Sequence, residues 1–251
     1  MKILIVNPNS TASMTAKIGA VAAEVAAPGT VVNAVNPPDS PASIECHTEE
    51  ALCVPGLLRC IQEGEAQGCD AYVIACFGDP GLEAAREQAR GPVIGIAEAA
   101  MHAASLLAPS FSVVTTLART TGMAWHLAER YGMQRFCRNV RAADVPVLDL
   151  EDPRKNARVL IRDECLRALR EDGCESIVLG CAGMTDLCRW LSEEIGAPVI
   201  DGVAVAVKFA ESLAALGLKT SKLGPWAAPP VKPSCGLAGP KGPAFDALVG
   251  E

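Results

Sequence analysis

The sequence predicts an α/β protein of two pseudo-symmetric lobes, each with a mainly parallel central sheet and flanking helices, and an active site in the cleft between them. Half of its 251 residues are hydrophobic but only 4% are aromatic, which favours helices packed on parallel sheets. Short apolar runs alternate with helical patterns along the chain. Part of the sequence also recurs about 105 residues later, so that Cys181 is the equivalent of Cys76.

The first elements are a strand, a helix and a second strand. Residues 2–7 form a short apolar run, after which Ser10 or Thr11 can cap a helix that extends to about residue 27. Residues 31–35 predict the next strand. The Pro, Asp and Ser residues that follow predict a loop over residues 36–45.

The rest of the first half continues the alternation. A helical pattern covers residues 47–67, and Pro55-Gly56 within it predicts a break or kink. Strands are then expected at residues 70–75 and 93–96, and helices at residues 80–88 and 97–107.

The second half repeats this order from Phe111 onward. The predicted strands are 111–115, a segment near Val140, 176–180 and 198–201, and the predicted helices are 122–131, 153–170, 185–195 and 203–216. Pro, Gly and Lys dominate after residue 218 and predict an irregular extension over 218–251. We expect lobe 1 to contain residues 1–96 and 204–217, and lobe 2 to contain residues 97–203.

Charge and hydropathy narrow the function classes. A net charge of −7 without a basic run disfavours a nucleic-acid partner. No apolar stretch is long enough to span a membrane, and the N-terminal residues lack the pattern of a signal peptide. We therefore expect a cytoplasmic protein with a small-molecule substrate.

Eleven cysteines is a high and odd count, which favours reduced thiols over a disulfide framework. No C-x-x-C motif occurs, and the three histidines are scattered, so no metal site is predicted. Cys46, Cys53 and Cys60 recur every seven residues, too far apart on one helix to share an ion. They are interpreted as buried apolar residues. His47 is the one histidine close to a motif.

The repeat singles out two cysteines. Gly68-Cys69-Asp70 with Cys76-Phe77-Gly78 matches Gly173-Cys174-Glu175 with Cys181-Ala182-Gly183. Cys76 and Cys181 follow their strands, and ligands of open parallel sheets bind at these carboxyl ends. Helix starts beyond them, with Asp79 and Thr185 as capping residues, are expected to lower the thiol pKa values and to hold a substrate oxygen.

Two thiols on opposite sides of a cleft suit a racemase that needs no cofactor. One thiolate can remove the proton from a carbon next to a carbonyl, and the other thiol can return a proton on the opposite face. A cysteine hydrolase would need a histidine base in the cleft, and no histidine lies in these motifs.

Together with Asn7-Pro8-Asn9-Ser10, the segments Cys76-Phe77-Gly78-Asp79-Pro80-Gly81 and Cys181-Ala182-Gly183-Met184 resemble the hydantoin racemase branch of the aspartate/glutamate racemase superfamily, over about residues 1–217. The resemblance implies racemisation at C5 of 5-substituted hydantoins without a cofactor, with Cys76 and Cys181 as the acid/base pair. It also implies a pocket lined by Asn9, Ser43, Phe77, Gly78, Asp79, Thr115, Thr116, Ala182, Gly183 and Met184. The extension after residue 218 departs from the family pattern.

Other functions stay open at this point. Within the superfamily they are an allantoin racemase, an aspartate/glutamate-type racemase, and a decarboxylase or isomerase that forms an enolate. Two α/β lobes around a cleft also describe a binding protein without catalysis. A homo-oligomer is expected.

Overall fold

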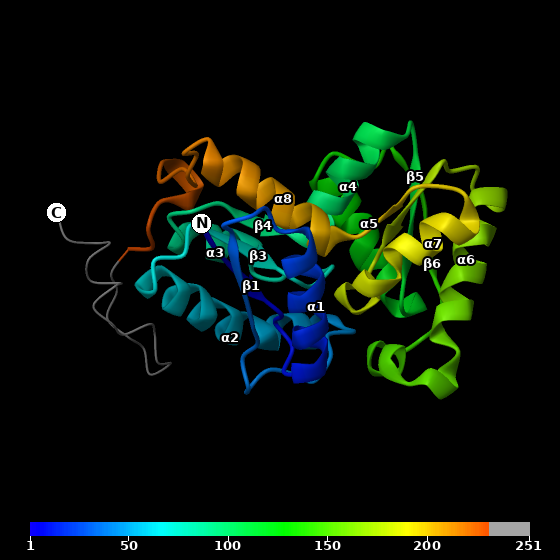
Figure 1. Cartoon of the computed structure of the whole chain (residues 1–251), viewed down its shortest axis with the longest axis horizontal. Helices are drawn as coiled ribbons and strands as arrows, with labels where there is room; N and C mark the ends of the chain where they lie inside the picture. Colours follow the sequence, from blue (N-terminus) through cyan, green and yellow to red (C-terminus); the bar gives the residue numbers. More distant parts are fainter. Residues whose placement is uncertain (231–251) are drawn as a thin grey trace.

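The structure is a computed structural model that describes residues 1–230, and its two four-stranded parallel sheets confirm the predicted fold class (Figure 1). The strand orders are β2-β1-β3-β4 and β6-β5-β7-β8, so the two halves have the same topology. The strands are β1 (Lys2–Val6), β2 (Val31–Val35), β3 (Ala71–Ile74), β4 (Val93–Gly95), β5 (Phe111–Thr115), β6 (Cys137–Ala142), β7 (Ser176–Leu179) and β8 (Val199–Ile200).

Helices connect the strands in the alternating order that the sequence predicts. They are α1 (Ala12–Val25), α2 (His47–Ala66), α3 (Leu82–Gln88), α4 (Ile96–Leu107), α5 (Thr121–Arg130), α6 (Ala157–Glu171), α7 (Cys188–Ile195) and α8 (Gly202–Ala215). Short 3-10 turns lie at Ala118–Thr120, Val147–Glu151, Pro153–Lys155, Ala182–Leu187 and Gly224–Trp226. No helix within residues 1–230 is long and apolar enough to cross a membrane.

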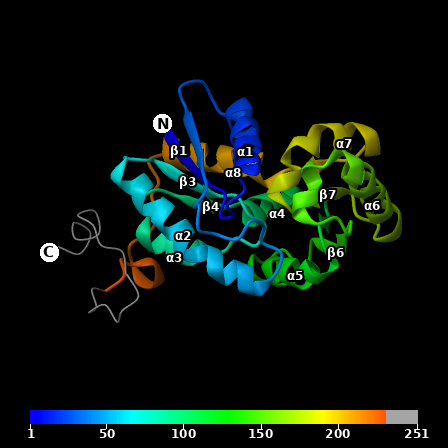
Figure 2. The ribbon, with the colours of Figure 1, turned by 90° about the horizontal axis from the view of Figure 1, so that it is seen from below.

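Alternate residues of β1 face the two helical layers of the first lobe, as strand geometry requires. Ile3 and Ile5 pack with α1 and α8, whereas Leu4 and Val6 pack with α2 and α3. The first sheet therefore lies between two layers of helices (Figure 2). Strands β3 and β4 are buried throughout, which explains their continuous apolar sequences, whereas edge strand β2 is partly exposed.

Helices also cover both faces of the second sheet. In each lobe, however, one of the covering helices follows a strand of the other lobe. Helices α4 and α5 pack on one face of the second sheet, and α6 and α7 on the other. Helix α4 follows β4 directly yet lies on the second sheet, while α8 follows β8 and lies on the first. The chain passes from one lobe to the other at the starts of α4 and α8, and these two crossings are in contact. A Cβ on Gly202 would lie 2.4 Å from the Ile96 carbonyl oxygen. We propose that the lobes divide at these crossings, near the predicted boundaries.

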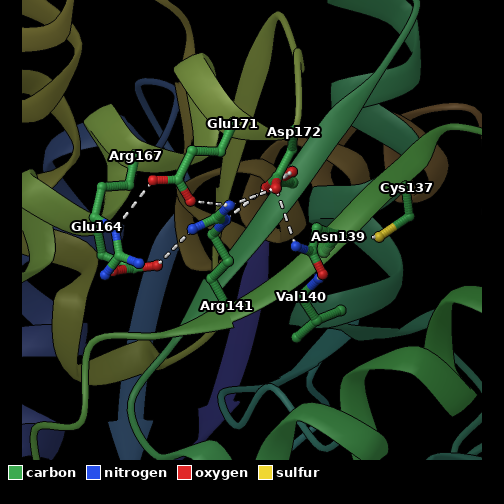
Figure 3. Close-up of polar contacts among 9 residues, drawn as sticks. Cys137, Asn139, Val140, Arg141, Glu164, Arg167, Glu171 and Asp172 are labelled. Carbon is green, nitrogen blue, oxygen red and sulfur yellow. Dashed lines mark hydrogen bonds and ion pairs between the residues drawn. The ribbon is translucent and has the colours of Figure 1, made fainter.

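A cluster of ion pairs ties edge strand β6 to α6 and the residue after it (Figure 3). The Arg141 guanidinium donates to Asp172 at 2.6 and 2.7 Å, to Glu171 at 2.8 Å and to Glu164 at 3.1 Å. Asn139 also donates to Asp172. Burial alone would raise the pKa of Asp172, but these hydrogen bonds hold it below its usual value.

A break or kink is predicted at Pro55-Gly56 in the second helix, and the break is wrong, because α2 runs without interruption from His47 to Ala66. Proline costs a helix one hydrogen bond and causes a steric clash. In α2 the apolar face formed by Cys53, Leu57 and Ile61 is fully buried, and this packing offsets the loss. The next residue, Gly56, lets the helix approach the loop before it, since a Cβ there would lie 2.7 Å from Pro37.

The start of the C-terminal extension packs against α3. The Lys222 ammonium donates to the carbonyl oxygens of Arg86 and Glu87, at the end of that helix. The Trp226 indole donates to Glu83 and stacks under Arg86. The prediction of an irregular extension over 218–251 falls partly outside the described residues, because 231–251 are not described.

Candidate active site

Cys76 and Cys181 occupy equivalent turns at the carboxyl ends of the central strands β3 and β7. The Asp79 N–H bonds the Cys76 carbonyl oxygen at 3.0 Å, and the Met184 N–H bonds the Cys181 carbonyl oxygen at 3.1 Å. In each turn the N–H two residues after the cysteine, at Gly78 or Gly183, hydrogen-bonds the sulfur. The repeat seen in the sequence is therefore also a repeat of local geometry.

Both thiols line one cavity, to which the two lobes contribute about equally. The cavity has a volume of about 60 Å³ and opens to the protein surface. The first lobe supplies Asn9, Met14, Ile44, Glu50, Ala75, Cys76, Phe77 and Gly78; the second supplies Thr115, Thr116, Thr120, Met123, Ala124, Val147, Gly180, Cys181 and Ala182.

Most of the predicted site residues lie on this cavity. They are Asn9, Cys76, Phe77, Gly78, Thr115, Thr116, Cys181 and Ala182. Ser43, Asp79, Gly183 and Met184 are buried beside it and are not among its lining residues. Met184 packs in the core of the second lobe, and a Cβ on Gly183 would lie 3.5 Å from the Cys181 sulfur.

Asp79 does cap a helix, but not the one that the sequence predicts. Its carboxylate accepts from the N–H groups of Ala97 and Glu98, which begin α4, and from the Tyr131 hydroxyl at 2.8 Å. Helix α3 starts later, at Leu82, and has no side-chain cap. Asp79 therefore joins the Cys76 turn to elements of the second lobe.

Loops from the two lobes meet around the cavity. Ser43 donates to Glu45, whose other carboxylate oxygen accepts from the Val147 N–H at 2.7 Å. On α1, Ser13 donates to Glu151 at 2.7 Å. These contacts place the Ile44 and Val147 walls next to each other, although one comes from each lobe.

The expected lowering of the thiol pKa values is wrong. Burial raises the pKa of Cys181 to about 11, and the hydrogen bond from Gly183 opposes this only in part. Burial also raises the pKa of Cys76 well above 9.0, and the electrostatic effect of Cys181 adds to it. Desolvation of the thiolates thus outweighs the backbone donors.

Several cavity residues were missed by sequence reasoning, and Glu50 is the most informative of them. It lies in the first turn of α2, one turn after His47, with 3.4 Å between its carboxylate and the His47 ring. Burial raises its pKa, and His47 opposes that rise. The three-residue spacing between His47 and Glu50, which places both on one face of a helix, could have indicated this pair from the sequence. Met14, Thr120 and Met123 carried no such signal, because they are ordinary positions near helix starts.

No arrangement of three or more His, Cys, Asp or Glu residues in the described part of the chain could hold a metal ion. The ten cysteines of residues 1–230 are free thiols. Cys53 and Cys60 of the seven-residue series are buried on α2.

The family model described as "Asp/Glu/Hydantoin racemase" matches residues 3–210. The chain belongs to this family. It is 53% identical to a hydantoin racemase from Rhizobium meliloti over 94% of this chain and 98% of the relative. It is 48% identical to a hydantoin racemase from a Pseudomonas strain over 89% and 90% of the two chains.

Solved structures agree with the family. An allantoin racemase from Klebsiella pneumoniae matches with a TM-score of 0.92 and 52% identity, over 94% of this chain and 97% of that one. As a member of the Asp/Glu/hydantoin racemase family, the chain is an isomerase, as the sequence predicts.

Proposed function

We propose that the chain is a cofactor-independent racemase that inverts the C5 centre of hydantoin rings through the thiols of Cys76 and Cys181. The observation that carries this proposal is their symmetry: one thiol from each half of the repeat lines a single cavity. Two acid/base groups that belong to different lobes can reach opposite faces of one carbon. The names of the relatives supply the ring to which this chemistry applies.

In the proposed reaction, one cysteine thiolate takes the C5 proton and becomes a thiol, and the electron pair moves onto the adjacent carbonyl as an enolate. The other thiol then gives its proton to the opposite face of C5 and becomes a thiolate. The Gly78 and Gly183 N–H groups stabilise each thiolate in turn. The Gly78 and Gly183 N–H groups are engaged with the sulfurs. The donors that we propose for the carbonyl oxygens are the Thr116 hydroxyl and the Asn9 amide, which also contacts the Met14 sulfur at 3.3 Å.

The cavity favours a neutral ring over an amino acid. Among the seventeen cavity-lining residues in 1–230, none is Lys or Arg, and eight are Met, Ile, Val, Phe or Ala. A dicarboxylate would bring two charges into this site without a cationic partner. A hydantoin ring brings paired N–H and C=O groups and no charge. An aspartate/glutamate-type substrate is therefore the weaker candidate.

Polarimetry of purified protein with D- and L-5-substituted hydantoins, allantoin, aspartate and glutamate tests the proposal. We expect loss of rotation with the hydantoins and allantoin, and none with the amino acids. In heavy water, deuterium should appear at C5. If neither enantiomer of any hydantoin takes up deuterium, a binding protein without catalysis is the better description.

The raised thiol pKa values predict a steep pH dependence. A group whose pKa lies near 11 is almost entirely protonated at neutral pH, and its thiolate fraction grows about tenfold per pH unit below that pKa. We expect kcat/KM for a 5-substituted hydantoin to rise with this slope from pH 6 to about pH 9, after subtraction of the rate without protein. A plateau that begins below pH 7.5 would contradict the raised pKa values.

A further inference from the structure

We propose that Glu50 selects substrates whose C5 substituent carries N–H donors, such as the ureido group of allantoin, over substrates with an apolar substituent. This inference rests on the proposed function, because it assumes that C5 lies between Cys76 and Cys181. It adds a residue that the pairing of the two cysteines does not require.

Glu50 is the one side chain, apart from the two thiols, that is ionisable among the described residues of the cavity lining. It lies against the Cys76 turn, since a Cβ on Gly78 would be 2.2 Å from its Oε1. Its Oε2 pairs with His47 at 3.4 Å, and no donor within residues 1–230 hydrogen-bonds its Oε1. An acceptor oxygen beside the reacting groups is thus available to a ligand.

The position of Glu50 suits the substituent better than the ring. Its side chain lines the cavity and keeps 22% of its surface exposed, and we therefore place it at the mouth of the cavity. The ring has to lie deeper, where the turns of Cys76 and Cys181 meet. A substituent on C5 then extends toward the carboxylate. An N–H donor would bond Glu50 there, whereas an alkyl group would desolvate the carboxylate without a compensating bond.

Allantoin and 5-isobutylhydantoin form a matched pair of probes, because the ureido and isobutyl groups have the same branched skeleton of four non-hydrogen atoms. Only the ureido group carries N–H donors. We expect Glu50→Leu to lower kcat/KM for allantoin by about 10- to 100-fold, the range of a hydrogen bond to a charged group. We expect kcat/KM for 5-isobutylhydantoin to stay the same or rise. Glu50→Gln should show a smaller loss for allantoin, carried mainly by KM.

The control is Glu63→Gln, an exposed carboxylate on the same helix α2, which should leave the ratio of the two kcat/KM values unchanged. If kcat/KM falls equally for both probes in Glu50→Leu and Glu50→Gln, Glu50 acts on the shared ring or on the fold, and the selective role is overturned. If kcat/KM changes for neither probe in these variants, the selective role is overturned as well. If the wild-type protein racemises neither probe, the proposed function itself fails, and the inference with it.

Discussion

Cys76→Ser and Cys181→Ser should each lower the kcat/KM of hydantoin racemisation by about 10²- to 10⁴-fold, the range that general acid–base catalysis contributes. A serine hydroxyl is far less acidic than a thiol, so the substituted face loses its base. The remaining thiol still reaches the other face. Each variant should therefore keep exchanging the C5 hydrogen of one enantiomer with heavy water, and the two variants should prefer opposite enantiomers. Polarimetry and NMR of the exchange measure both effects.

The repeat also offers a matched pair of controls. Cys69 and Cys174 are related by the same repeat but precede β3 and β7, at the opposite ends of the strands from the cavity. Cys69→Ser and Cys174→Ser should retain racemisation and exchange of both enantiomers. Full racemase activity in either Cys76→Ser or Cys181→Ser would refute the two-base mechanism.

Arg141→Met should lower the free energy of unfolding by about 1–3 kcal/mol, the cost of leaving a largely covered acceptor without its partner. The Arg141 side chain is 11% exposed and that of Asp172 is 6% exposed, so the carboxylate would remain buried without its cation. Strand β6 would also lose its ties to α6 (Figure 3). Urea denaturation followed by circular dichroism measures the change.

Arg167→Met is the matched control, since Arg167 contacts Glu164 and Glu171 but is 53% exposed. Exposed pairs of this kind contribute about 0–1 kcal/mol.

The pH dependence of stability is a second measurement. The pKa of Asp172 is lowered in the folded state, so its contribution is present above the unfolded value of about 4 and is lost as the pH falls through the folded pKa. Arg141→Met should weaken this acid sensitivity, and a loss no larger than that of Arg167→Met would contradict the role of Arg141.

Much of the fold could be predicted because apolar runs and helix patterns are strong local signals. The strands 31–35 and 111–115 have the predicted bounds, since both are short apolar runs flanked by turn residues. The continuity of α2 through Pro55 could not be predicted in this way. It depends on tertiary packing of Cys53, Leu57 and Ile61, which no local pattern contains.

For the site, too, local patterns could be predicted, and contacts between distant segments could not. The repeat located the turns of Cys76 and Cys181, because equivalent strand ends face the same way in a duplicated fold. The partners of Asp79 could not be inferred, since Ala97, Glu98 and Tyr131 are distant in sequence. The pKa directions were missed because a sequence reveals helix starts but not the depth of burial, and desolvation is the larger effect here.

The exchange of α4 and α8 has a consequence for how the halves could exist apart. A chain cut after β4 would leave the first sheet without α8, and the apolar residues Ile3, Ile5 and Val73 would meet water on that face. The other fragment would keep α4 but would carry an α8 with nothing to cover. Each lobe is complete only with a helix that the other lobe supplies, as in a domain-swapped dimer joined into one polypeptide. The cavity that holds Cys76 and Cys181 therefore depends on this exchange of helices.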